Sequence, residues 1–205
     1  MDIKRRYMNN TGKPKGLFGK IMIKSMNKHH ADVSDWGLSH IPKKDYELMM
    51  DIGCGGGKNL SKLLKIFPET NFTGTDYSSV SLKSTERLNK EEIESGRLNL
   101  VKADVSSLPF KDGTYDYITA CETVYFWPGP LKSFKEIYRV LKDNGTFMII
   151  NASNGIDEDT ARWSKEIDGI TFYEEDELKG YLKEAGFKNL KIERKGTWIL
   201  IQGEK

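Results

Sequence analysis

The sequence predicts an α/β fold in which a mostly parallel sheet carries helices on both faces and ends in an antiparallel hairpin. Three observations predict it. An apolar strand pattern at residues 47–52 runs directly into a glycine-rich turn, strand and helix patterns then alternate, and the last two strand patterns flank a tight turn. The chain has 205 residues, which is enough for a single domain with a sizeable core.

The glycine-rich turn separates the first predicted strand from a predicted helix. Residues 47–52 are expected to form this strand, because after Glu47 they make an apolar run interrupted only by Asp51, as in a buried parallel strand. Residues 58–67 place apolar side chains at helical spacing, and Pro68 ends that helix. Glycines at such a junction let the backbone approach a ligand and leave amides free at a helix N-terminus. We therefore expect a nucleotide-like cofactor at this turn.

The spacing of the glycines narrows the choice of cofactor. A dinucleotide-binding turn needs G-x-G-x-x-G, but Lys58 stands where the third glycine should be, which argues against a nucleotide-dependent oxidoreductase. No Gly-Lys-Ser/Thr follows at the distance that a P-loop requires. The turn instead reads Asp51-x-Gly53-x-Gly55-x-Gly57. A tight turn without a ligand remains the alternative until other residues are considered.

Two more acids close predicted strands. Asp76 follows the strand pattern at residues 71–75 and lies 25 residues after Asp51, near the roughly 20-residue offset of a ribose-binding acid. Its carboxylate could accept hydrogen bonds from both ribose hydroxyls. Asp104 follows the strand pattern at residues 97–102. Each acid alone could be a helix cap or a turn residue, but three in this order favour a ligand site.

The remaining patterns complete the sheet. The Asn144-Gly145 turn precedes a strand, and Gly186 is placed to end the last helix. Strands are expected at residues 115–121 and 146–151, helices at 131–141 and 174–185, and an antiparallel hairpin at 187–193 and 197–202.

The glycine turn resembles the first motif of a known family. Together with residues 115–116, 133–136 and 140–145, it looks like the class I, Rossmann-like S-adenosylmethionine-dependent methyltransferases of the small-molecule, quinone-biosynthesis type. The resemblance implies a seven-stranded, mostly parallel sheet, with S-adenosylmethionine as cofactor and S-adenosylhomocysteine as product. In that family the acid at the position of Asp104 receives the adenine amino group. The cofactor-binding residues that the resemblance implies are Asp51, Gly53, Cys54, Gly55, Gly57, Asp76, Tyr77, Ser78, Asp104, Val105 and Cys121.

We expect residues 1–45 to form a basic arm with lid helices and residues 46–205 to form the Rossmann-like domain. Eight basic residues and one acidic residue give residues 1–28 a net charge of +7 within a total of +2. Residues 1–15 are interpreted as a solvated tail, as blocks of like charge usually are. Residues 17–36 begin with an apolar stripe at helical spacing and are interpreted as a lid that excludes water from a sulfonium. A basic amphipathic helix on a membrane surface is the competing interpretation.

Three residues are candidates for catalysis. His29 and His30 could supply a general base, although paired histidines are also ordinary helix-end or surface residues. Tyr125 is expected to face the substrate, with Phe126 or Trp127 capping the core. An insertion at about residues 152–173 could cover the substrate as a second wall.

Methyl transfer by in-line displacement requires alignment of two reactants and exclusion of water, so little side-chain chemistry is obligatory. The sequence lacks an Asn-Pro-Pro-Tyr-type signature of base methylation and has no metal-ligand spacing. We therefore expect a small-molecule acceptor and no metal or nucleic-acid partner, in a monomer or homodimer. The attacking atom, O, N, S or C, stays open. A non-catalytic S-adenosylmethionine-binding protein and a methyltransferase of RNA or protein are the alternatives.

Two cysteines without metal or redox spacing favour a reducing, cytoplasmic location. The sequence has no signal-peptide pattern and no apolar run long enough to span a bilayer.

Overall fold

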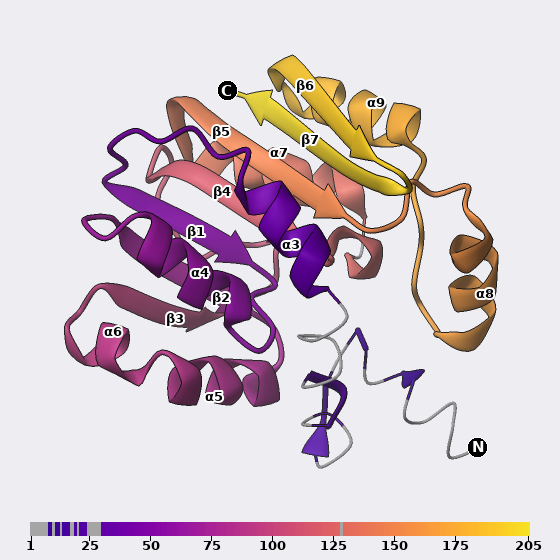
Figure 1. Cartoon of the computed structure of the whole chain (residues 1–205). Helices are drawn as coiled ribbons and strands as arrows, with labels where there is room; N and C mark the ends of the chain where they lie inside the picture. The colour runs from indigo at the N-terminus through magenta and orange to yellow at the C-terminus, as the bar shows by residue number, and fades with distance from the viewer. Residues whose placement is uncertain are drawn as a thin grey trace.

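The computed structural model describes residues 8, 9, 11, 12, 14–16, 19, 21–23, 30–127 and 129–205. A seven-stranded sheet forms its centre, in the order β3-β2-β1-β4-β5-β7-β6 (Figure 1). The neighbouring strands β3, β2, β1, β4 and β5 pair in parallel, and β7 pairs antiparallel with both β5 and β6. The strands are β1 (Leu48–Ile52), β2 (Asn71–Asp76), β3 (Leu98–Lys102), β4 (Tyr115–Cys121), β5 (Leu141–Asn151), β6 (Lys188–Lys195) and β7 (Trp198–Glu204).

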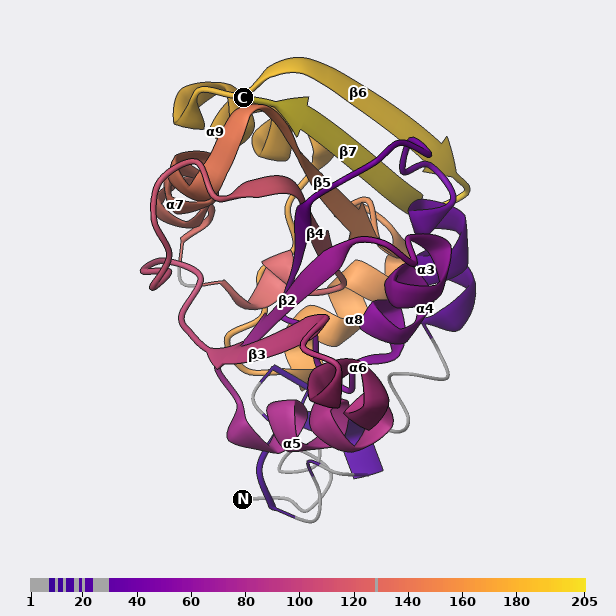
Figure 2. The same ribbon diagram turned by 90° about the vertical axis from the view of Figure 1, so that its left-hand side faces the viewer.

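Helices cover both faces of the sheet, as Figure 2 shows. Helices α3, α4 and α6 lie on one side of it, and α7 and α9 lie on the other. Two apolar cores correspond to these two faces. The helices are α3 (Ala31–Leu38), α4 (Lys58–Ile66), α5 (Ser79–Leu88), α6 (Lys90–Glu94), α7 (Pro130–Val140), α8 (Glu158–Glu166) and α9 (Glu175–Ala185), with a 3-10 turn at Val124–Phe126.

The order of the strands fixes where a ligand can bind. The chain runs outward from β1 to β2 and β3 and then returns to β4 on the other side of β1. The connections that follow β1 and β4 therefore diverge, and they leave a crevice at the carboxyl ends of these two strands. Both strands are almost wholly buried, so this end of the sheet is a rigid platform.

The predicted class of fold is confirmed, including the terminal hairpin around Lys195 and Gly196. The structure differs in detail. Strand β5 begins at Leu141 instead of residue 146, because the Asn144-Gly145 turn lies within the continuous strand, and Asn144 has a positive φ of 63°. Helices α5 and α6 are additional to the predicted elements, and α8 lies inside the insertion. No helix among the described residues is long and apolar enough to cross a bilayer.

Candidate functional site

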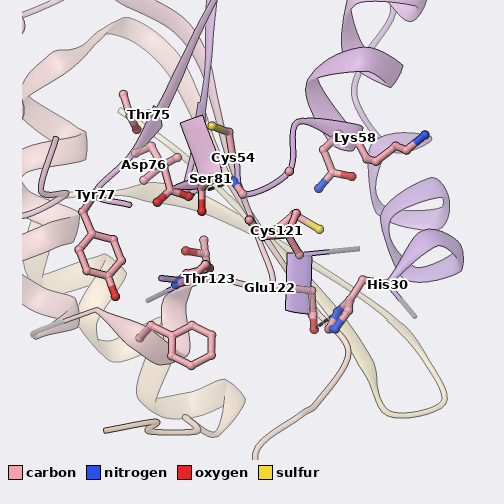
Figure 3. A pocket seen from close by; sticks show the side chains of 18 of the residues that line it. His30, Cys54, Lys58, Thr75, Asp76, Tyr77, Ser81, Cys121, Glu122 and Thr123 are labelled. Atoms are coloured by element: carbon pink, nitrogen blue, oxygen red, sulfur yellow. Dashed lines mark hydrogen bonds and ion pairs between the residues drawn. The ribbon is translucent and has the colours of Figure 1, made fainter. Parts of the chain in front are cut away.

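A cavity of about 570 Å³ opens at the carboxyl ends of β1, β2, β3 and β4. Its floor is the glycine turn, and its walls come from residues at the ends of the other three strands. Figure 3 shows Cys54 of the turn, with Asp76 and Tyr77 from the end of β2 and Glu122 and Thr123 from the end of β4. Parts of the N-terminal segment and the start of α3 close the remaining side. The main lining segments are residues 52–56, 75–77, 103–105 and 121–123, with Thr11, Gly12, Pro14, Ile23, His30, Ser34 and Phe126.

Two glycines of the turn are required by the packing around them. A Cβ on Gly53 would lie 2.2 Å from Thr123 Oγ1, so the turn can lie against the loop after β4 only without a side chain there. A Cβ on Gly57 would lie 2.7 Å from Thr85, and the φ of Gly57 is 79°. Gly57 does not line the cavity. It therefore shapes the turn from behind, where Asn89 Nδ2 donates to its carbonyl oxygen at 3.2 Å.

Asp76 ties the end of β2 to the glycine turn. Its Oδ2 accepts a hydrogen bond from Gly55 N at 3.0 Å, and its Oδ1 accepts one from Ser78 N at 2.7 Å. Burial raises the pKa of Asp76, although these two amides favour the ionised form. Asp76 lines the cavity, and a carboxylate has about four acceptor positions, so the group could still accept hydrogen bonds from a ligand.

Asp51 stands behind the turn and does not line the cavity. It is 2% exposed, and its Oδ1 accepts a hydrogen bond from Thr119 Oγ1 at 2.7 Å. Burial, together with the charge of Asp76, raises the pKa of Asp51 to about 7. Its role in this structure is to connect β1 to β4 beneath the floor of the cavity.

The loop after β3 is held in place by α7. Leu108 N donates to Glu136 Oε1 at 2.7 Å, and Arg139 donates to the carbonyl oxygens of Leu108 and Phe110 at 3.0 and 2.8 Å. This clamp fixes the segment that presents Asp104 and Val105 to the cavity. It was not among the predicted features, and its one signal in the sequence is the spacing of Glu136 and Arg139 on a predicted helix.

Both cysteines are free and buried. Cys54 and Cys121 line the cavity, and burial raises the pKa of each thiol far above its usual range. Cys121 Sγ lies 3.4 Å from Ser34 Oγ of α3. Both side chains therefore act as small apolar wall groups and not as thiolates.

The N-terminal segment forms part of the cavity wall. Tyr77 Oη donates to Gly12 O at 2.7 Å, and Ser78 Oγ donates to Pro14 O at 2.8 Å. A Cβ on Gly12 would lie 2.7 Å from the ring of Phe126. The expectation that residues 1–15 form a solvated tail is therefore wrong for Gly12 and Pro14, because their backbone is bound to the residues that follow β2.

Two further contacts anchor the arm and α3. Asn9 and Asp168 exchange hydrogen bonds, with Asn9 Nδ2 2.7 Å from Asp168 Oδ2 and Asp168 N 3.0 Å from Asn9 Oδ1. Lys62 of α4 lies 2.6 Å from Asp35 Oδ1 and donates to Ala31 O at 3.2 Å. The segments before β1 are thus held to both the insertion and the helix that follows the glycine turn.

Glu122, the residue after β4, gathers three groups around its carboxylate. Tyr125 Oη donates to Oε1 at 2.8 Å, and Ala152 N also donates to Oε1. His30 Nδ1 lies 2.5 Å from Oε2, and the two side chains point toward each other in Figure 3. Glu122 has a positive φ of 57°, which is rare for a residue with a side chain and occurs where the surroundings impose it.

The catalytic candidates are only partly brought together. His30 lines the cavity, whereas His29 lies outside the described residues. Tyr125, expected to face the substrate, is buried behind the wall, and its hydroxyl is bound to Glu122. Phe126 and Trp127 line the cavity instead. The expected role of Tyr125 is therefore wrong, because the 3-10 turn directs its side chain inward. Trp127 also packs against Phe134 and Phe147 in the apolar core, as expected for one of the two residues that follow Tyr125.

The insertion does not supply a direct second wall. None of its described residues lines the cavity. Phe172 packs against Tyr125 with ring centroids 4.9 Å apart, and Thr171 N donates to Tyr125 O at 2.9 Å. The insertion therefore supports the loop after β4 from outside.

The predicted cofactor-binding residues divide into two groups. Three of them, Asp51, Gly57 and Ser78, do not line the cavity, and each supports a residue or turn that does. The others line one continuous surface. They are Gly53, Cys54, Gly55, Asp76, Tyr77, Asp104, Val105 and Cys121.

Comparisons with known proteins agree with this geometry. Residues 50–149 match the family model described as "Methyltransferase domain". They and the surrounding fold identify a Rossmann-like, S-adenosylmethionine-dependent methyltransferase domain, and the resemblance inferred from the glycine turn is confirmed.

Three proteins illustrate the similarity. Cycloartenol-C-24-methyltransferase 1 of Oryza sativa subsp. japonica is 36% identical over 101 residues, which are 49% of this chain and 29% of that protein. The chloroplastic 2-methyl-6-phytyl-1,4-hydroquinone methyltransferase 1 of the same plant is 25% identical over 151 residues, 72% of this chain and 43% of that protein. A Haemonchus contortus phosphoethanolamine N-methyltransferase 2 in complex with S-adenosyl-L-methionine has a TM-score of 0.77 at 15% identity, covering 100% of this chain and 60% of that one. This chain therefore spans less than half of the length of the two plant relatives.

The residues present fit S-adenosylmethionine as the cofactor. At Gly55, which lines the cavity, a Cβ would come no nearer than 3.8 Å to another atom, so this side of the turn is open and a ligand can approach the backbone there. Asp76, Asp104 and Val105 line the same cavity as the glycine turn. Their carboxylates and amides would hold the ribose hydroxyls and the adenine edge of a bound adenosyl group, because these groups form hydrogen bonds with carboxylates and amides.

Proposed function

We propose that this chain transfers a methyl group from S-adenosylmethionine to a small-molecule acceptor by in-line displacement. The cofactor supplies an electrophilic methyl on a sulfonium. The residues of the chain hold the adenosyl group, orient the acceptor and exclude water.

One observation carries the proposal. The glycine turn, Asp76 and Asp104 all border one cavity, which continues past the end of β4 to His30 and Glu122. The first part fits an adenosyl group, and the second part leaves polar groups for another reactant. Three of the similar proteins are named for small acceptors, which are cycloartenol methylated at C-24, 2-methyl-6-phytyl-1,4-hydroquinone and phosphoethanolamine. Their names support a small molecule over a polymer.

Binding of the cofactor is the first test. Calorimetric titration of the full chain with S-adenosylmethionine and with S-adenosylhomocysteine should give saturable one-to-one binding of both. Titration with NAD serves as the matched control, and it should give no heat of binding because the dinucleotide spacing is broken at Lys58. Binding of NAD but not of S-adenosylmethionine would reverse the assignment.

The class of acceptor needs a second test. The protein is incubated with methyl-labelled S-adenosylmethionine and, separately, with a small-molecule extract, total RNA and a protein fraction. We expect label in the small-molecule fraction, in a product identified by mass spectrometry. Label in RNA or protein alone would move the function to a macromolecular methyltransferase, and cofactor binding with no transfer to any fraction would favour a non-catalytic binding protein.

We also propose a reducing compartment, the cytoplasm, and a monomer or homodimer. Two buried free cysteines support the former. Fractionation of source cells and sedimentation of the purified chain test these two points.

A further inference from the structure

We propose that His30 is the general base of the reaction, that Glu122 positions it, and that the acceptor reacts through an atom that carries a proton, above all a hydroxyl oxygen. This inference rests on the proposed function and adds the class of acceptor to it. It starts from the contact between His30 Nδ1 and Glu122 Oε2, 2.5 Å apart at the edge of the cavity.

The Glu122 carboxylate is held rigidly. Its side chain is 8% exposed, and both oxygens have contacts, with Tyr125 and the Ala152 amide on one and His30 on the other. Burial and the charge of Glu122 raise the pKa of the Tyr125 hydroxyl far above its usual range, so this hydroxyl remains a donor. Such a fixed carboxylate can determine how a neighbouring imidazole is oriented.

The contact selects the tautomer of His30. A carboxylate only accepts hydrogen bonds, so it favours the imidazole form with the proton on Nδ1. Nδ1 is buried and makes no hydrogen bond of standard geometry among the described residues, and its contact with Glu122 Oε2 at 2.5 Å is an ion-pair contact. About a third of the His30 side chain is exposed. Because Nδ1 is buried, this exposed surface belongs to the other atoms of the side chain, and the ring lines the cavity. The unprotonated Nε2 is then available to a reactant.

The other ionisable groups near this part of the cavity do not replace His30. Asp35 and Lys62 pair with each other at 2.6 Å. The Cys121 thiol stays protonated because burial raises its pKa. Lys58 lies at the start of α4 on the cofactor side. Burial alone would lower the pKa of His30, but contact with Glu122 and its charge raise it above the ordinary value.

The proton balance identifies the acceptor class. The attacking oxygen forms a bond to the methyl carbon while the sulfonium–methyl bond breaks and its electron pair remains on sulfur. The hydroxyl proton passes to His30 Nε2, and Glu122 stabilises the imidazolium until it releases the proton to water. A base assists a hydroxyl most, because a neutral hydroxyl is a weak nucleophile at neutral pH. An unactivated alkene has no proton to give before attack.

The first experiment needs no methyl transfer. Ring-¹⁵N-labelled protein is titrated by NMR, and the signals of His30 are assigned by their loss in His30→Asn. We expect the Nδ1-protonated tautomer at high pH, and a His30 pKa that is lower in Glu122→Gln than in wild type because the charge of Glu122 is lost. Glu158→Gln, an exposed carboxylate-to-amide change on α8, is the matched control and should leave the titration unchanged. An Nε2-protonated tautomer, or the same pKa in Glu122→Gln and wild type, overturns the proposal.

The second experiment uses the small-molecule extract and methyl-labelled cofactor at several pH values. Base catalysis contributes about 10²–10⁴-fold, so His30→Asn should lower the rate at pH 7 by at least about 100-fold and regain rate at alkaline pH, where the acceptor ionises by itself. Glu122→Gln should shift the pH profile in the direction of the NMR pKa. Label attached to an atom that carried no ionisable proton, such as a thioether sulfur or an alkene carbon, overturns the acceptor class.

Calorimetry separates failure of this inference from failure of the proposed function. Both variants should bind S-adenosylhomocysteine as wild type does. If wild type itself binds neither form of the cofactor, the proposed function fails, whatever the NMR titration gives. If both variants bind S-adenosylhomocysteine normally and the pH profile of methyl transfer is unchanged, only the assignment of His30 as the base fails.

Discussion

At the scale of single residues, Asp76 combines an observed structural role with a proposed binding role. It accepts hydrogen bonds from the backbone amides of Gly55 and Ser78, and under the proposed function it also binds ribose hydroxyls. A hydrogen bond to a charged group contributes about 1.5–3 kcal/mol. We therefore expect Asp76→Asn to weaken S-adenosylmethionine binding by about that amount, measured by calorimetric titration. Asp143→Asn, on an exposed residue, is the control. Unchanged affinity in Asp76→Asn would remove this acid from the site.

The alanine variant should also destabilise the fold. Asp76→Ala leaves the Gly55 and Ser78 amides without their acceptor, and an unsatisfied buried amide costs about 1–3 kcal/mol. Denaturant unfolding of the unliganded protein measures this loss. Equal stability of the alanine and asparagine variants would show that solvent satisfies both amides.

Cys54 tests whether the glycine turn has covalent chemistry. Its thiol is buried 3.8 Å from Thr85 Oγ1, and burial raises its pKa well above the ordinary value. We expect Cys54→Ala to keep methyl transfer within about twofold and to lose about 1 kcal/mol of stability. Initial rates with labelled cofactor and thermal unfolding measure the two effects. Normal cofactor binding with abolished transfer would instead indicate a chemical role for the thiol.

At the scale of elements, the N-terminal arm is part of the site. Deletion of residues 1–15 removes Thr11, Gly12 and Pro14 from the cavity wall, so it should weaken cofactor binding and reduce turnover at least about tenfold through loss of water exclusion. Deletion of residues 1–7 removes basic residues of the arm but none of these contacts. If the shorter deletion alone abolishes activity, the charge of the arm and not its packing is what matters.

A point substitution provides a finer test of the same element. A side chain at Gly12 would meet the ring of Phe126 at 2.7 Å, so Gly12→Ala should displace the arm from the cavity. We expect lower affinity for S-adenosylmethionine and faster proteolysis of the arm in the presence of cofactor. Gly180→Ala is the control, because a side chain there meets no atom within 4 Å. Equal affinity in both variants would show that the arm adjusts without cost.

At the scale of the whole molecule, buried acids determine how stability depends on pH. Asp51 has a folded pKa of about 7, against an ordinary value of 3.8. Between these values the folded protein binds a proton that the unfolded chain does not, so the free energy of unfolding falls as pH rises from about 4 to about 7. Asp76, whose pKa is also raised, contributes in the same direction.

Asp51→Asn isolates this contribution. Asparagine keeps an acceptor for Thr119 but cannot ionise, so the fall in stability between pH 4 and 7 should become shallower in the variant. Denaturant unfolding at several pH values measures it. His30 contributes to the pH dependence of stability with the same sign, at higher pH. Its raised pKa adds stability below about pH 6.5, and this stability is lost as the pH rises through the folded pKa. The same slope in wild type and Asp51→Asn would assign the pH dependence to other groups.

The sequence by itself determined the sheet, the glycine turn and the acids at the ends of β1, β2 and β3. These features follow from local patterns, because a strand or helix reveals its period within a few residues and a glycine turn requires specific residues at fixed spacing. The carboxyl ends of parallel strands lie at one edge of a sheet, so local patterns alone predict that these acids are neighbours.

Only the tertiary structure decided which side chains share the cavity. The contact of Glu122 with His30, the packing of Gly12 against Phe126 and the hydrogen bonds between Asn9 and Asp168 join segments far apart in the chain. The direction of Tyr125 depends on a 3-10 turn that has no periodic signal. Such contacts depend on how loops pack over the sheet, and packing is a property of the assembled fold rather than of any local stretch of sequence.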